Sequence, residues 1–160
     1  MIILQDTKEK TPWSFVSFEQ CAAQKLIHLE EGDYTLEEYP LLVALERKKS
    51  VEELATNLGM KYTQFKNEME RLRKYRFRYV VCEFSEIDVL NYPHKSKLPA
   101  AVKAKLRMSG KFLMHRIGEL IDTYEIEFVY CNSRYSATKK AMELLLDAER
   151  IYQQERININ

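Results

Sequence analysis

The chain has 160 residues, of which 46% are hydrophobic and 31% charged, and its formal net charge at pH 7 is +1. This length can bury a full core, and the hydrophobic content excludes an intrinsically disordered chain. No run approaches the ~20 consecutive apolar residues that span a bilayer, which excludes a membrane-spanning protein.

Four strands are predicted in the first third of the chain, over residues 2–5, 24–29, 33–36 and 41–48. The apolar start is short and lacks a basic leader, so we interpret it as the first strand and not as a signal peptide. The pair Gly32-Asp33 is a turn signal between β-prone segments. The apolar run from Leu41 to Leu45 leads into Glu46 and predicts a buried strand.

Helices and strands alternate in the remainder. Ser50 is a predicted N-cap, with Glu53 three residues later as in a capping box, and Gly59 ends that helix. The other predicted elements are a helix from Thr63 to about Tyr75, a strand over 77–84, a helical region from Pro99 to about Tyr124 with a break near Ser109-Gly110, a strand over 126–131, and a helix from Ser133 or Ser136 to about Tyr152. No linker or repeat divides the chain, which predicts one domain over residues 1–160.

The chemistry is concentrated around the 41–48 strand. Side chains alternate along a strand, so Glu46 and Lys48 should share one face while Arg47 points the other way. If the segments beside the Gly32-Asp33 turn pair with this strand, Asp33 lies beside Glu46. Two carboxylates, with water and a substrate phosphate, suit Mg²⁺ or Mn²⁺.

Two further acids, Asp6 and Glu52, could complete a four-carboxylate cluster, and a lysine beside it would face a phosphate. This combination predicts a metal-dependent phosphodiesterase. Each part alone has an ordinary explanation, because Glu-Arg-Lys is common on solvated helix faces and Gly-Asp is a common turn. The apolar run that leads into Glu46 favours the site.

This combination resembles the XPF-type nuclease domain of the restriction-endonuclease-like superfamily, whose motif is Gly-Asp, a variable gap, Glu-Arg-Lys, three residues and Asp. The matching segments are Asp6–Phe15, Gly32-Asp33-Tyr34, Glu46-Arg47-Lys48, Glu52, Val80–Glu83 and Phe128–Cys131, so the resemblance covers nearly the whole chain. Two positions depart from the pattern. Glu52 stands where the family has aspartate. Lys8 stands where the family often has arginine, and lysine keeps the charge but cannot make the bidentate contact of a guanidinium.

The resemblance implies an α/β fold of the restriction-endonuclease-like type, with a mixed central sheet flanked by helices. It implies a divalent-metal-dependent DNA endonuclease that acts on branched or otherwise structured DNA in repair, recombination or replication. Asp33 and Glu46 would bind Mg²⁺ or Mn²⁺, with Asp6 and Glu52 coordinating directly or through water. Lys48 would orient water or stabilise the phosphate, and Arg47 would support the site. The alternative is a non-catalytic DNA-binding or scaffold subunit.

The chain contains a basic stretch despite its low net charge. No acidic residue lies between Asp88 and Glu119. Such stretches neutralise phosphates and release counterions. The predicted DNA-binding residues are Lys8, Lys95, Lys97, Lys103, Lys105, Arg107 and Lys111. A second basic cluster over residues 71–78 could serve the same purpose or form a solvated helix face.

Partners and compartment are also predicted. The resemblance implies a homodimer through C-terminal elements, and the last helix carries a wide apolar stripe that could pack on its own sheet or meet a partner: Ala141, Leu144, Leu145, Leu146, Ala148, Ile151 and Tyr152. No glycine-containing helix-hairpin-helix module is expected, so preference for a DNA structure would come from the domain, a dimer partner or another protein. Three cysteines cannot all pair, which predicts an intracellular protein of the cytoplasm and nucleoid, or of a nucleus.

Overall fold

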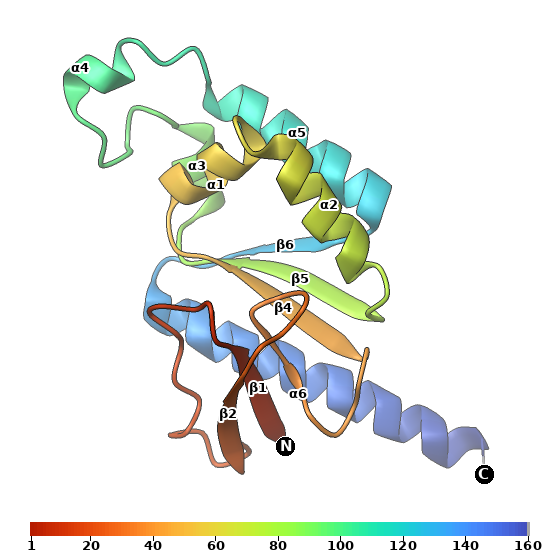
Figure 1. Ribbon diagram of the computed structural model, residues 1–160. Coiled ribbons are helices and arrows are strands. Elements are labelled where there is room, and N and C mark those ends of the chain that lie inside the picture. Colours follow the sequence, from red (N-terminus) through yellow and green to blue (C-terminus); the bar gives the residue numbers. More distant parts are fainter. Residues whose placement is uncertain (160) are drawn as a thin grey trace.

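A computed structural model describes residues 1–159 and shows one six-stranded sheet in the order β2-β1-β3-β4-β5-β6 (Figure 1). Its strands are β1 (Ile2–Asp6), β2 (Ala23–Ile27), β3 (Tyr34–Leu36), β4 (Val43–Lys48), β5 (Phe77–Cys82) and β6 (Glu127–Tyr130). Only β3 among them is antiparallel to its neighbours, whereas β1 and β2, β4 and β5, and β5 and β6 pair in parallel. The predicted mixed sheet is confirmed.

Helices cover both faces of this sheet (Figure 1). The first face carries α1 (Val51–Leu58), α2 (Tyr62–Leu72), α3 (Glu86–Leu90) and α5 (Gly110–Tyr124), and the other face carries α6 (Arg134–Ile159). The short helix α4 (Ala100–Lys103) projects from one end of the molecule. Within residues 1–159 no helix is both long and apolar enough to cross a membrane.

Each face has its own hydrophobic core, and β4 contributes to both. Ala44 packs in the core beneath α1, α2 and α5, together with Leu54 and Leu113. Val43 and Leu45 pack in the core against α6. Alternation along β4 therefore sends successive side chains to opposite layers, as expected for a strand buried on both faces.

Several boundaries differ from the predictions. The fourth strand begins at Val43 because Leu41 has φ of 63°, outside the β region. The second helix begins at Tyr62 without a side-chain cap, so Thr63 is not its N-cap. The last helix continues to Ile159, past the predicted end at Tyr152.

Two of the predicted helix caps, Ser50 and Ser133, are confirmed. Ser50 Oγ accepts the Glu53 N–H at 3.2 Å, although the Glu53 carboxylate returns to the Lys49 N–H and not to Ser50. Ser133 Oγ accepts the Ser136 N–H at 3.1 Å at the start of α6. A cap needs only residues three apart, so local sequence identifies it.

The site depends on one edge of the sheet, which we call the carboxyl edge. There β1, β2, β4, β5 and β6 end and β3 begins, which places Asp6, Tyr34 and Lys48 at the same edge. The loop after β1 and helix α4 both lie at this end of the molecule (Figure 1). Ligand sites of open α/β sheets commonly form outside the carboxyl ends of their strands.

Candidate active site

A polar hollow of about 170 Å³ opens at the carboxyl edge, between the sheet and α2. We call it the acidic hollow. The charged residues of its lining are Asp6, Lys8, Glu30, Glu31, Asp33, Glu46, Glu68 and Arg71. Three of the four predicted acids therefore line one surface, with Lys8 beside them.

Asp33 is held against β4 by backbone contacts. Its N–H donates to Leu45 O at 2.8 Å, and its carboxylate Oδ2 accepts the Arg47 N–H at 2.7 Å. Gly32 precedes it with φ of +72°, and a Cβ there would lie 3.3 Å from Leu45 O. Glycine is favoured in this left-handed turn pressed onto a neighbouring strand. The predicted placement of Asp33 beside Glu46 is found.

Glu46 and Lys48 share one face of β4 and form an ion pair. Lys48 Nζ donates to Glu46 Oε1 at 2.8 Å, and the Lys48 side chain is only 5% exposed. Its ammonium also lies 4.9 Å from the Phe65 ring centroid. Lys48 is not among the residues that line the acidic hollow, and its link to the hollow is the ion pair with Glu46.

Asp33 and Lys48 are the two charged neighbours of Glu46, and the pKa of each is shifted for a different reason. Burial raises the pKa of Asp33 well above its ordinary value, and repulsion from Glu46 raises it further. Burial acts to lower the pKa of Lys48, but attraction to Glu46 and the hydrogen bond between them outweigh burial and raise it. Asp33 and Glu46 thus repel each other in a site where a positive charge would be favourable.

The other two predicted acids are placed differently. Asp6 is buried and lines the hollow, but its Oδ1 accepts the Leu29 N–H at 3.0 Å. Glu52 is not in the lining; its Oε1 accepts the Lys97 N–H at 2.6 Å. Within residues 1–159 no group of three or more His, Cys, Asp or Glu side chains is arranged to hold a metal. Glu52 is thus separated from the hollow in which the other three predicted acids lie.

Arg47 points to the opposite face of β4, as the alternation predicted. Its Nε donates to Glu83 Oε1 at 2.8 Å, and its NH1 donates to Glu9 Oε2 at 2.6 Å and to Thr11 O at 2.7 Å. Trp13 Nε1 shares Glu83 Oε1 at 2.7 Å. The Arg47 side chain is 4% exposed, so it anchors the loop after β1 to the sheet.

Glu9 and Glu83 were missed by sequence reasoning. They lie 38 and 36 residues from Arg47, and no local spacing links positions so far apart. The available signals were weak: Glu83 lies near the end of the predicted 77–84 strand, and Glu9 stands between two lysines. Burial acts to lower the pKa of Arg47, but hydrogen bonds and attraction from both carboxylates raise it.

Residues 93–109, which we call the basic arm, form a loop closed at its base by a hydrogen bond of 2.9 Å from Gly110 N to Tyr92 O. Lys103 Nζ donates to the His94 carbonyl at 3.0 Å. Within the described chain, the other predicted DNA-binding residues of this stretch make no ion pair: Lys95, Lys97, Lys105, Arg107 and Lys111. The arm carries α4 and lies at the carboxyl edge (Figure 1).

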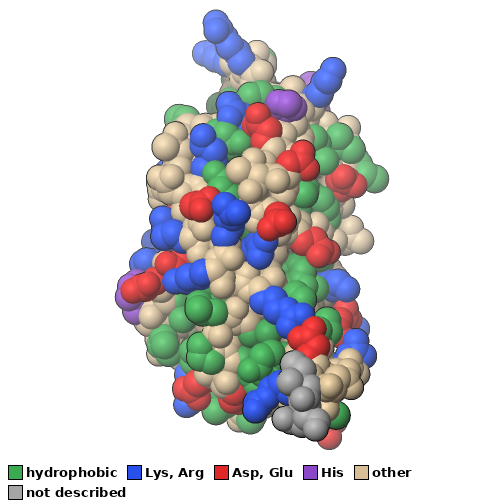
Figure 2. Space-filling view, turned by 90° about the vertical axis from the view of Figure 1, so that its right-hand side faces the viewer, with side chains coloured by type: hydrophobic (Ala, Val, Ile, Leu, Met, Phe, Trp, Pro, Cys, Tyr) green, Lys and Arg blue, Asp and Glu red, His purple; other side chains and the backbone are tan. Residues whose placement is uncertain are grey.

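The second basic cluster, residues 71–78, differs from the basic arm because acidic side chains neutralise its charges. Arg78 pairs with Glu125 at 2.9 Å, Arg73 with Glu70 at 3.5 Å, and Arg76 with Glu155. Lys74 and Arg71 both pair with Glu31. Figure 2 shows the end of the molecule away from the arm, where basic and acidic side chains are interspersed. Residues 71–78 thus form a salt-bridged surface.

Comparison with protein-family models and with curated proteins found no match. Among solved structures, XPF from Aeropyrum pernix is 15% identical with a TM-score of 0.67, and the alignment covers 98% of this chain and 69% of that one. XPF from Aeropyrum pernix in complex with DNA is 14% identical with a TM-score of 0.65, covering 93% and 65% respectively. The chain therefore has the fold of these XPF structures and spans about two thirds of their length.

Proposed function

We propose that this chain is a divalent-metal-dependent endonuclease that hydrolyses phosphodiester bonds in branched or otherwise structured DNA, in repair, recombination or replication. The observation that carries the proposal is the pairing of Asp33 and Glu46 in one hollow, with Lys48 bonded to Glu46. The shared fold with an XPF structure in complex with DNA supports DNA as the substrate.

The donor set fits a small hard cation. Among the described residues, Asp33 Oδ1 and Glu46 Oε2 make no hydrogen bond, while the second oxygen of each carboxylate is fixed. Magnesium commonly binds through one or two carboxylates and retains several waters, so two acids suffice. When bound, Mg²⁺ or Mn²⁺ would polarise the phosphate and activate a water.

The chain's own residues hold these donors in place. The Arg47 N–H fixes one oxygen of Asp33, and Lys48 fixes one oxygen of Glu46, which leaves the other oxygen of each available. We assign Lys48 to orient Glu46 and to add positive charge behind the reacting phosphate. Lys8 lines the hollow and is placed to contact that phosphate directly.

The basic arm supplies the proposed contacts to the rest of the DNA. Its unpaired cations lie at the same edge as the acidic hollow, whereas the 71–78 cluster is neutralised by Glu31, Glu125 and Glu155. Unpaired lysines and arginines can release counterions from phosphates without first breaking a salt bridge.

Cleavage of a panel of fluorescent DNAs tests the function. Duplex, fork, flap and nicked substrates would be incubated with Mg²⁺, with Mn²⁺ and with EDTA. We expect nicking of at least one branched substrate, dependent on metal and lost in Asp33→Asn. Binding of the same DNAs without cleavage under any metal condition would instead establish the scaffold-subunit alternative.

Assembly remains a separate proposal. The apolar stripe of α6 packs on the chain's own sheet, with Ala141, Leu145 and Ala148 buried in the core. A homodimer, or a protein partner that confers DNA-structure preference, therefore rests on the family resemblance alone. Light scattering at micromolar concentration tests the dimer, and a 19.0 kDa monomer unchanged by DNA would contradict it.

A further inference from the structure

A second hollow, of about 240 Å³, lies next to the acidic hollow and shares Lys8 with it. We call it the basic hollow. Its charged lining consists of Lys8, Glu9, Lys10, Arg47, Lys49 and Glu53, and Thr11 completes it. Its volume is several times the roughly 30 Å³ that one water occupies in the liquid, so a tetrahedral anion fits.

The two carboxylates of this hollow are already engaged. Glu9 accepts from Arg47 NH1 at 2.6 Å, which neutralises the buried guanidinium. Glu53 Oε2 accepts the Lys49 N–H at 3.0 Å, and this acid lies in the first turn of α1. Neither acid forms an ion pair with the lysines of the hollow within residues 1–159.

The three lysines are therefore the available charges. Lys8, Lys10 and Lys49 are exposed, and their ammonium groups make no ion pair or hydrogen bond within the described chain. Flexible ammonium groups act as point charges toward phosphate. Three such groups around one hollow form a local positive excess that the net charge of +1 conceals.

We propose that the basic hollow binds a phosphate directly beside the scissile one on the cleaved DNA strand. The proposal rests on the function assigned above, because the acidic hollow would hold the scissile phosphate. Lys8 joins the two hollows, so adjacent phosphates of one strand would occupy them. No apolar or aromatic side chain of residues 1–159 lines the basic hollow, which suits backbone phosphate and not a stacked base.

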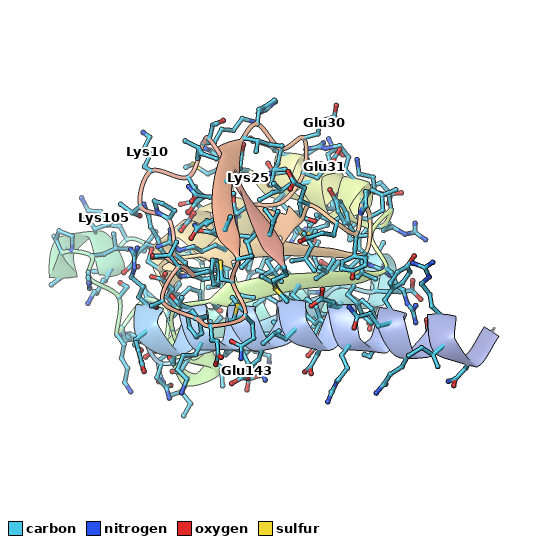
Figure 3. All side chains as sticks on the ribbon, turned by 90° about the horizontal axis from the view of Figure 1, so that it is seen from below. Lys10, Lys25, Glu30, Glu31, Lys105 and Glu143 are labelled. Carbon is cyan, nitrogen blue, oxygen red and sulfur yellow. The ribbon has the colours of Figure 1, made fainter. Side chains whose placement is uncertain are left out.

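The strand path continues beyond this hollow. Figure 3 shows Lys10 and Lys105 at the same end of the molecule, while Glu30 and Glu31 lie farther toward the other end. The lysines of the basic arm thus extend the positive surface that begins at the basic hollow. Glu30 and Glu31, which also line the acidic hollow, disfavour a path of the polyanion in the opposite direction.

Methylphosphonate scanning of one strand of a branched DNA tests the proposal. Each phosphate of one strand near the branch point would be replaced, one at a time, by a neutral methylphosphonate, and DNA affinity would be measured by fluorescence anisotropy in EDTA. The proteins are the wild type, the double variant Lys10→Ala/Lys49→Ala, and the charge-matched control Lys61→Ala/Lys66→Ala. The control lysines lie beside and within α2, outside both hollows.

The hollow variant should bind unmodified DNA about tenfold more weakly than wild type, because it loses charge-assisted contacts to one phosphate. Its slope of log affinity against log salt should fall by about one. A neutral linkage at one position of the strand should weaken DNA binding by the wild type and the control, but should leave binding by the hollow variant unchanged.

Equal sensitivity to that linkage in the hollow variant and the wild type would overturn the proposal. These measurements need no metal and no cleavage, so they separate the two proposals. If wild type binds DNA with the expected phosphate pattern but never cleaves, the nuclease assignment fails and the phosphate site stands.

Discussion

The Asp33 carboxylate accepts a 2.7 Å hydrogen bond from the backbone N–H of Arg47, whose guanidinium is clamped on the opposite face of β4. One residue thus fixes a proposed metal ligand through its backbone and anchors the loop after β1 through its side chain. The position of the Asp33 carboxylate on one face of the sheet therefore depends on the packing of the Arg47 side chain on the other face.

Asp33→Asn should abolish cleavage yet stabilise the metal-free protein. Asparagine retains an oxygen acceptor for the Arg47 N–H but removes a buried charge that Glu46 repels. We expect the free energy of unfolding in EDTA to rise by on the order of 1 kcal/mol. Urea unfolding measures this change, and a destabilised but active variant would contradict it.

Asp88→Asn is a matched control that should change the free energy of unfolding in the opposite direction. Asp88 accepts from the Ser85 hydroxyl at 2.7 Å and from the Ser85 N–H at 3.0 Å, and these bonds lower its pKa. A lowered folded-state pKa stabilises the protein above the unfolded value of ~3.9, and this contribution is lost as pH falls through the folded value. Asp88→Asn should therefore destabilise the protein at pH 7 and differ less from wild type near pH 3.

Lys48→Met should reduce turnover more than DNA affinity. The methionine keeps contact with Phe65 but leaves Glu46 without its buried partner, which should cost about 3 kcal/mol of folding stability. The added change Glu46→Gln should recover part of that stability. Single-turnover rates at saturating protein separate rate from binding, and an unchanged rate with weaker binding would refute the role of Lys48.

Arg47→Lys should destabilise the protein by roughly 2–3 kcal/mol. Lysine cannot contact Glu9 and Glu83 with a planar fork, and both acids would lose a charge-assisted bond. The control is Arg76→Lys, whose partner Glu155 is nearly half exposed, and it should change stability by less than ~1 kcal/mol. Equal effects of the two variants in urea unfolding would show that the clamp is not structural.

Two variants of Glu52 test whether this residue supports the basic arm instead of binding a metal. Glu52→Ala removes the acceptor for the Lys97 N–H, whereas Glu52→Gln retains it. If Glu52 only supports the arm, trypsin should cut residues 93–109 about fivefold faster in the alanine variant, with the glutamine variant close to wild type.

The control for this experiment is Glu86→Ala, an exposed acid at the start of α3 that makes no hydrogen bond to the arm within residues 1–159. Trypsin sensitivity needs neither DNA nor metal, so it reports on the arm alone. Equal protection in Glu52→Ala and wild type would show that this hydrogen bond does not hold the arm.

Features set by short-range rules were predictable from sequence. Strand alternation separated Arg47 from Glu46 and Lys48, the Gly32 turn placed Asp33, and Ser50 capped α1. Each depends on residues within a few positions or on one strand pairing. Helix α3 was missed, since a five-residue helix has too few turns to show a 3.6-residue period.

Contacts across long sequence separations were not predictable. The partners of Arg47 depend on where the loop after β1 and the end of β5 meet. The orientation of Glu52 depends on the arm returning to α1, and the basic hollow combines residues 8–11 with residues 47–53. A motif identified the acids, but the tertiary fold decided which of them share a hollow.

The central claim, that Asp33 and Glu46 form the metal site for DNA cleavage, is tested most directly by the Mg²⁺ dependence of single-turnover cleavage. Wild type and Glu46→Gln would be compared on the branched DNA that wild type cleaves fastest. We predict that Glu46→Gln needs at least ~10-fold more Mg²⁺ and shows almost no cleavage at the concentration that saturates wild type. The same Mg²⁺ dependence and rate in both proteins would contradict the assigned site.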